Sequence, residues 1–149
     1  MRTLAIDLGN KRVGLALGDA GGTLASPYEV LVVGEPSQAT SPILKVIDRE
    51  GVERVVLGLP LNMDDSVGPQ ARAVIAWGTA LAAAAGVPVI YVDERLSSFA
   101  AEQQLIGLKR AGQKLTRKDK KRSLDALAAA EFLQAFLDGK LPAIEPDEL

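Results

Sequence analysis

The sequence predicts an α/β domain built on a mixed five-stranded sheet flanked by helices. Two observations predict it: three strand-like segments come first, and strands then alternate with helices. Strands joined by short turns pair antiparallel, whereas strands joined through a helix pair parallel. With 149 residues, the chain has the length of one domain with a sizeable core. We therefore expect a single domain over residues 1–140 and a C-terminal tail over residues 141–149.

The first nineteen residues predict a β-hairpin. An apolar strand that carries one carboxylate, Asp7, is followed by a polar turn at residues 10–12 and a second apolar run, residues 13–19. A carboxylate inside a buried strand is costly unless a cation or hydrogen-bond donors meet it. Asp7 therefore predicts a metal or phosphate site. The alternative is an aspartate at the end of the strand that caps the turn at residues 9–10.

Apolar periodicity and breakers predict the later elements. A third antiparallel strand is expected at residues 28–33, bounded by Pro27 and Gly34, and buried parallel strands are expected at residues 54–59 and 88–92. Four helices are predicted from their caps and breakers, near residues 41–50, 68–85, 97–109 and 123–137. Residues between the last two helices are expected to form a loop.

The composition excludes several kinds of catalytic site. The chain has no cysteine, so disulfides and thiolate zinc sites are impossible, and it has no histidine, so histidine-based triads are excluded as well. Catalysis must then depend on carboxylates, Lys, Tyr, Ser or Thr. Carboxylate oxygens are hard ligands, which favour Mg²⁺ or Mn²⁺.

Positive charge is concentrated in one stretch, residues 109–122, which we call the basic segment. The net charge is only −2, yet eight of the 17 Lys and Arg residues lie in the basic segment, beside a single acid, Asp119. Such a segment is either a solvated loop or a surface that neutralises nucleic-acid phosphates. It contains no aromatic residue, so duplex or branched substrates fit it better than stacked single strands.

No membrane association is expected. Residues 73–92 carry no charge, but Gly86 and Pro88 interrupt the stretch, which reads as a buried helix followed by a buried strand. The N-terminus lacks the pattern of a signal peptide, so we expect a cytoplasmic protein.

Three acids stand where predicted elements begin or end. Asp7 is in the first strand, Glu94 follows a parallel strand, and Asp125 is in the first turn of the last helix. Ligands of open α/β sheets collect beyond the carboxyl ends of the strands. Three converging carboxylates suit two divalent cations that clamp a phosphodiester and activate water. One alternative is that Asp125 only stabilises the N-terminus of its helix through the helix dipole. Another is that Glu94 only forms an ion pair with Arg95 or a nearby lysine.

Four motifs in register give the chain a resemblance to a known family. They are residues 5–14 (AIDLGNKRVG), residues 58–64 (GLPLNMD), residues 93–97 (DERLS) and Asp125-x-x-Ala128-Ala129. The chain resembles the YqgF (RuvX) family of the RNase H-like superfamily, which is described as pre-16S rRNA nucleases or Holliday junction resolvases. The similarity extends from residue 3 to about residue 137.

The resemblance implies an RNase H-like fold with Asp7, Glu94 and Asp125 as catalytic residues and as ligands of Mg²⁺ or Mn²⁺. The family commonly has Thr at Asn10 and Gly at Asp65. RuvC-type resolvases carry another acid or His where this chain has Arg122. Together with the basic segment, the motifs predict contacts to nucleic acid from Lys11, Arg12, Asn62, Arg95, Ser97, Lys114, Arg117, Lys118, Lys120, Lys121 and Arg122.

These features predict a metal-dependent endonuclease acting on structured nucleic acid, in processing of the 5′ end of pre-16S rRNA, in Holliday junction resolution, or in both. A first alternative is an actin-like ATP-binding phosphotransferase, because Asp7-Leu8-Gly9 followed by Gly14 also resembles a phosphate loop. Such enzymes need two lobes and a longer chain. A second alternative is a nucleic-acid-binding protein without catalysis. A homodimer is also possible, since the Ala-rich helix around Trp77 suits either a core or an interface.

Overall fold

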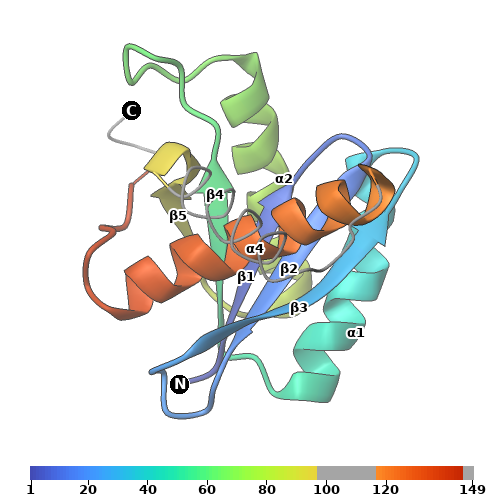
Figure 1. The fold of residues 1–149 in the computed structure, drawn as a ribbon, viewed down its shortest axis with the longest axis vertical. Coiled ribbons are helices and arrows are strands. Elements are labelled where there is room, and N and C mark those ends of the chain that lie inside the picture. Colours follow the sequence, from blue (N-terminus) through green and yellow to red (C-terminus); the bar gives the residue numbers. More distant parts are fainter. Residues whose placement is uncertain (97–116, 146–149) are drawn as a thin grey trace.

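The computed structural model describes the backbone of residues 1–96 and 117–145, with side chains for residues 1–95 and 126–145. Its sheet has five strands in the order β3-β2-β1-β4-β5 (Figure 1). The strands are β1 (Thr3–Leu8), β2 (Arg12–Gly18), β3 (Ala25–Val32), β4 (Arg54–Leu59) and β5 (Val89–Asp93). β2 pairs antiparallel with β1 and β3, whereas β4 pairs parallel with β1 and β5. The predicted mixed sheet is confirmed, with β1 at its centre.

The helices lie close to the predicted positions. They are η1 (Pro36–Ala39), α1 (Thr40–Glu50), α2 (Pro69–Ala85), η2 (Glu94–Leu96) and α4 (Arg117–Leu137). Gly51 and Gly86 end α1 and α2 in the left-handed conformation, with φ of 63° and 70°. This is the helix end that glycine favours, because it has no side chain to clash there. The helix predicted at residues 97–109 lies outside the described residues.

Two predicted boundaries are wrong. β3 begins at Ala25 rather than Tyr28 and includes Pro27, which is the Cα partner of Ala16 beside a register shift in β2. β3 is an edge strand, where proline is tolerated. α4 begins at Arg117 rather than near Ser123. Residues 117–122 contain neither Gly nor Pro and are rich in Lys and Arg, which favour helix, so this part of the basic segment is helical and not a loop.

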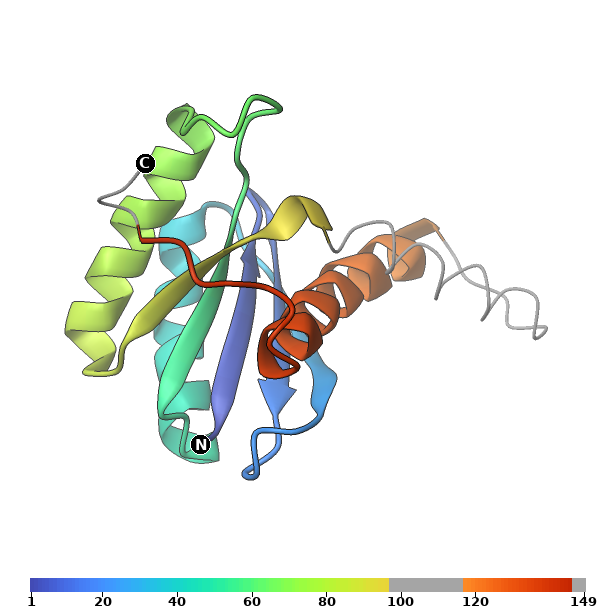
Figure 2. The same cartoon turned by 90° about the vertical axis from the view of Figure 1, so that its left-hand side faces the viewer.

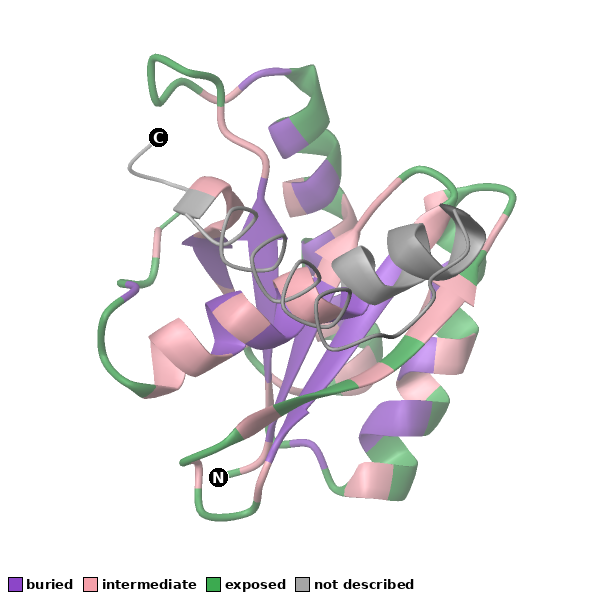
Figure 3. Ribbon diagram, viewed as in Figure 1, coloured by how far each residue is buried: buried purple, intermediate pink, exposed green. Residues whose placement is uncertain are grey.

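The sheet lies between two helical layers. Figure 2 shows α1 and α2 on one face and α4 across the other. Alternate residues of β1 divide between them: Leu4 and Ile6 pack with α1 and α2, whereas Ala5 packs with α4 residues such as Phe132. The purple strands of Figure 3 show that both faces of the central strands are buried. The α4 face is lined by smaller residues, including Ala5, Ala16 and Val56, so α4 can approach the sheet closely.

The first part of the predicted C-terminal tail packs against the sheet. Leu141 is buried. The backbone N–H of Ile144 donates to the carbonyl of Tyr91 over 2.7 Å and forms an antiparallel bridge to β5. This contact covers part of an edge strand that would otherwise expose its backbone groups. Among the helices of the described ranges, none is both long and apolar enough to cross a membrane.

Candidate active site

Asp7 and Glu94 come together at the carboxyl ends of the parallel strands. Asp7 is the residue after Ile6, which is paired with Leu57 of β4, and Glu94 directly follows β5. Side chains alternate along a strand, so Asp7 lies on the same face of β1 as Ala5, which is the face that α4 covers. Because β4 lies between β1 and β5, the two carboxylates meet across one residue of that strand, Gly58.

Gly58 is required for this approach. A Cβ at Gly58 would lie 2.9 Å from both Cβ and Oε2 of Glu94 and 3.2 Å from Cε2 of Phe132. The Glu94 side chain therefore passes directly over the backbone of β4 and under α4. The sequence prediction placed Gly58 in the strand at residues 54–59 and in the motif of residues 58–64, but missed this role. A glycine within the apolar run of residues 54–59 was the available signal, because glycine inside a strand often marks a close approach.

Asp7 and Glu94 are coupled electrostatically. Burial, followed by the negative charge of Asp7 and a hydrogen bond with its carboxylate, raises the pKa of Glu94 to about 8. The pair therefore holds one proton near neutral pH, because two adjacent carboxylates cannot both ionise easily. The alternative role for Asp7 is that of a turn cap. The turn closes through a 2.9 Å bond from the Gly9 N–H to the Arg12 carbonyl, and Asp7 is paired in the strand with Gly14.

The donor set of this pair fits a divalent cation. Two half-buried carboxylates that share a proton offer oxygen ligands, and a cation of the Mg²⁺ type can take the place of that proton. The third predicted ligand, Asp125, lies in α4, but its side chain is outside the described part of the chain. Among the residues whose side chains are described, no three acids are arranged to hold a metal ion.

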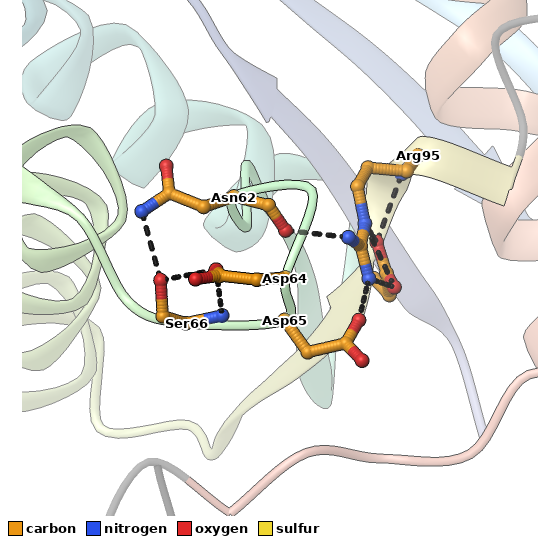
Figure 4. Close-up of polar contacts among 6 residues, drawn as sticks. Asn62, Asp64, Asp65, Ser66 and Arg95 are labelled. Carbon is orange, nitrogen blue, oxygen red and sulfur yellow. Dashed lines mark hydrogen bonds and ion pairs between the residues drawn. The ribbon is translucent and has the colours of Figure 1, made fainter.

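Arg95, the residue after Glu94, joins β5 to the loop that follows β4 (Figure 4). Its Nε donates to Asp93 Oδ1 over 2.9 Å, and its Nη2 donates to Asp93 Oδ2 and to Asp65 Oδ1, each over 2.6 Å. Its Nη1 donates to the Asn62 carbonyl over 2.6 Å. These carboxylates raise the pKa of Arg95, and the guanidinium lowers the pKa of Asp93.

The loop of residues 62–66 is closed by its own hydrogen bonds. The Asn62 N–H donates to the Ser66 carbonyl, and the Asp65 N–H donates to the Asn62 carbonyl, over 3.0 and 2.9 Å. Asp64 Oδ1 accepts from the N–H and the hydroxyl of Ser66, which lowers the pKa of Asp64. The predicted contact residues Asn62 and Arg95 are thus both engaged within the protein.

The other predicted contact residues are placed only in part. Lys11 is exposed in the turn that follows β1, and Arg12, the first residue of β2, is half-buried at the same end of the sheet as Asp7. Ser97 and Lys114 lie outside the described residues. Five basic residues belong to the first turns of α4 and precede Asp125 in the chain: Arg117, Lys118, Lys120, Lys121 and Arg122.

Comparisons with known proteins identify the family of the chain. Residues 1–139 match the model of a family described as "RuvX: Holliday junction resolvase". The chain belongs to the RuvX family. It is similar to a RuvX relative from Acidiphilium cryptum (strain JF-5), with 40% identity over 92% of this chain and 84% of the relative. It is also similar to one from Anaeromyxobacter sp. (strain K), with 42% identity over 95% of this chain and 100% of the relative. Both relatives bear the name "Putative pre-16S rRNA nuclease".

Two solved structures with a similar fold are Holliday junction resolvases. RuvC of T. thermophilus in complex with a Holliday junction substrate has a TM-score of 0.58 at 21% identity, covering 97% of this RuvX chain and 100% of that chain. The resolvase of fowlpox virus with Holliday junction DNA has a TM-score of 0.56 at 12% identity, covering 93% and 98%. At such identities the likeness establishes the fold, which is RNase H-like, as the sequence predicts.

Proposed function

We propose that this RuvX protein is a divalent-metal-dependent endonuclease that hydrolyses phosphodiester bonds in structured nucleic acid. The observation that carries the proposal is the Asp7–Glu94 pair at the carboxyl ends of β1 and β5. Two adjacent, half-buried carboxylates forced to share a proton are unfavourable for the fold alone. Their arrangement is explained by a cation that binds between them.

In this proposal Asp7, Glu94 and Asp125 hold Mg²⁺ or Mn²⁺. The bound ions would supply Lewis-acid stabilisation of the phosphate and a water of lowered pKa. The chain itself contributes the placement of its ligands. Gly58 leaves the space in which Glu94 reaches Asp7, and Phe132 of α4 covers this approach and keeps bulk water from one side of it. A dry, fixed set of ligands acts more strongly on developing charge than a solvated one.

Nucleic acid is the substrate class that the surrounding residues suit. The basic residues in the first turns of α4 lie ahead of Asp125, and the turn with Lys11 and Arg12 lies at the same end of the sheet as Asp7. Lysine and arginine at such positions neutralise phosphates without reading sequence.

Two substrates follow from the similar proteins. The names of the curated relatives point to pre-16S rRNA, and the family description points to the Holliday junction. Precursor rRNA is the stronger proposal, because relatives at 40% identity over almost the whole chain bear that name, whereas the junction-bound structures support only the fold.

A side-by-side cleavage assay tests the proposal. The protein is incubated with a precursor 16S rRNA fragment and with a four-way DNA junction of similar length, in Mg²⁺, in Mn²⁺ and in EDTA. We expect metal-dependent cleavage, stronger on the rRNA fragment. Binding without cleavage in either metal would favour the non-catalytic alternative. ATP binding in calorimetry, without nucleic-acid binding, would favour the phosphotransferase alternative.

A further inference from the structure

Arg95 presents a guanidinium whose position is fixed from two sides. Asp93 accepts from its Nε and Nη2 as a fork, and the Asn62 carbonyl accepts from Nη1. The same carbonyl also accepts a hydrogen bond from the Asp65 N–H. The guanidinium therefore contacts the acceptor of the hydrogen bond that closes the loop. These contacts hold Arg95 in place without the side chain of Asp65.

Asp65 is held differently. Its side chain is 81% exposed, whereas the side chain of Arg95 is 30% exposed. Its backbone has a φ of 68°, a left-handed conformation that glycine adopts without strain and aspartate tolerates. The turn therefore requires no carboxylate at this position. The residue expected there from the resemblance, glycine, would form the same turn and leave the Nη2 donor of Arg95 open to solvent.

The Asp65–Arg95 ion pair can exchange with another anion. An ion pair with an exposed carboxylate contributes little to stability, since water competes for both charges. A phosphodiester oxygen is an equivalent acceptor, and guanidinium groups bind phosphate through paired N–H donors. Arg95 directly follows Glu94, so a phosphate bound there would lie beside the carboxylate pair.

We propose that Arg95 is a phosphate-binding residue which Asp65 covers in the free protein, so that Asp65 lowers the affinity for nucleic acid. This inference rests on the proposed function, because it takes the phosphate to be that of a nucleic-acid backbone. With Asp65 in place, the group of Arg95, Asp93 and Asp65 carries a net charge of −1. Without Asp65 it is neutral, and an Nη2 donor is free.

Asp64 gives a matched control. It lies in the same loop and is exposed, but its hydrogen bonds go to Ser66 rather than to Arg95. Asp64→Asn and Asp65→Asn remove the same charge, and each amide oxygen can still accept a hydrogen bond. A gain specific to Asp65 thus reports on the Arg95 guanidinium and not on the charge of the loop. Asp65→Gly serves as a second variant, since it also suits the backbone at this position.

The first experiment measures binding without cleavage. Fluorescence anisotropy follows a labelled precursor rRNA fragment and a labelled four-way DNA junction in EDTA. Asp65→Asn and Asp65→Gly are expected to bind about two- to fivefold more tightly than Asp64→Asn. The difference should vanish when each is combined with Arg95→Gln. Equal affinities for the Asp64 and Asp65 variants, or weaker binding by the latter, would overturn the inference.

A second readout separates this inference from the proposed function. The side-chain Nε–H signal of Arg95 is followed by NMR during titration with inorganic phosphate. It should shift at lower phosphate concentration in Asp65→Gly than in the parent. If the NMR signal shifts with phosphate but the protein binds no nucleic acid, the result would support the phosphate site and contradict the proposed substrate. An identical response in both proteins would contradict the site itself, whatever the substrate.

Discussion

Replacing Glu94 with glutamine should stabilise the metal-free protein at neutral and alkaline pH but not at acidic pH. Burial and Asp7 raise the pKa of Glu94 from 4.5 to about 8. Between these values the folded protein holds a proton that the unfolded chain has released, so the free energy of unfolding falls as pH rises. The slope is about 1.4 kcal/mol per pH unit. Glutamine is always neutral and keeps the shape of the protonated acid, so it avoids this loss.

The expected gain in the free energy of unfolding is roughly 3–5 kcal/mol at pH 8 and under about 1 kcal/mol at pH 5. Urea denaturation in EDTA at both pH values measures it. Asp48→Asn is the control, because Asp48 is an exposed carboxylate of α1 and should show no such change. A gain of equal size at both pH values, or destabilisation at pH 8, would refute the account of the carboxylate pair.

The remaining predictions concern packing and charge. Gly58→Ala should reduce cleavage at least tenfold, because its Cβ would displace Glu94, whereas Gly21→Ala should retain activity, since the nearest atom reached by its Cβ lies at 3.8 Å. Phe132→Ala should lower the free energy of unfolding by about 3–5 kcal/mol in urea denaturation, because this fully buried ring joins α4 to the sheet. Replacing Lys118, Lys120 and Lys121 with Ala should weaken the salt dependence of nucleic-acid binding. In titrations from 50 to 200 mM salt, the slope of log affinity against log salt concentration should become shallower by up to about three. The same titration with Lys45→Ala, an exposed lysine of α1, should leave the slope unchanged.

Local patterns predicted much of the fold. Residues 55–59 form a continuous apolar run, and β4 (Arg54–Leu59) has the predicted bounds. The glycines after α1 and α2 marked where both helices end. The two boundary errors have a common cause. Pro27 breaks a strand only where its missing N–H would be needed, and the start of α4 carries charges rather than an apolar face, so neither feature follows from sequence patterns alone.

The sequence predicted that Asp7 and Glu94 lie near each other but not the contacts that support them. The proximity of Asp7 and Glu94 could be predicted from the sequence, because ligand-binding residues of open α/β sheets gather at the carboxyl ends of the strands. The role of Gly58 depends on β4 lying between β1 and β5, which is a property of the sheet order. The contact of Arg95 with Asp65 depends on the turn geometry of the loop of residues 62–66. The contact between Arg95 and Asp65 joins segments distant in the sequence and leaves no local signal.

The most direct test of the central claim is metal-dependent cleavage by Asp7→Asn. The change removes one charge from the carboxylate pair and preserves the size of the side chain. Cleavage of the precursor rRNA fragment in Mg²⁺ and in Mn²⁺ is compared with that of the parent and of Asp64→Asn. The account predicts that Asp7→Asn loses cleavage at least a hundredfold while still binding the RNA, and that Asp64→Asn remains active. Cleavage by Asp7→Asn at the rate of the parent would contradict it.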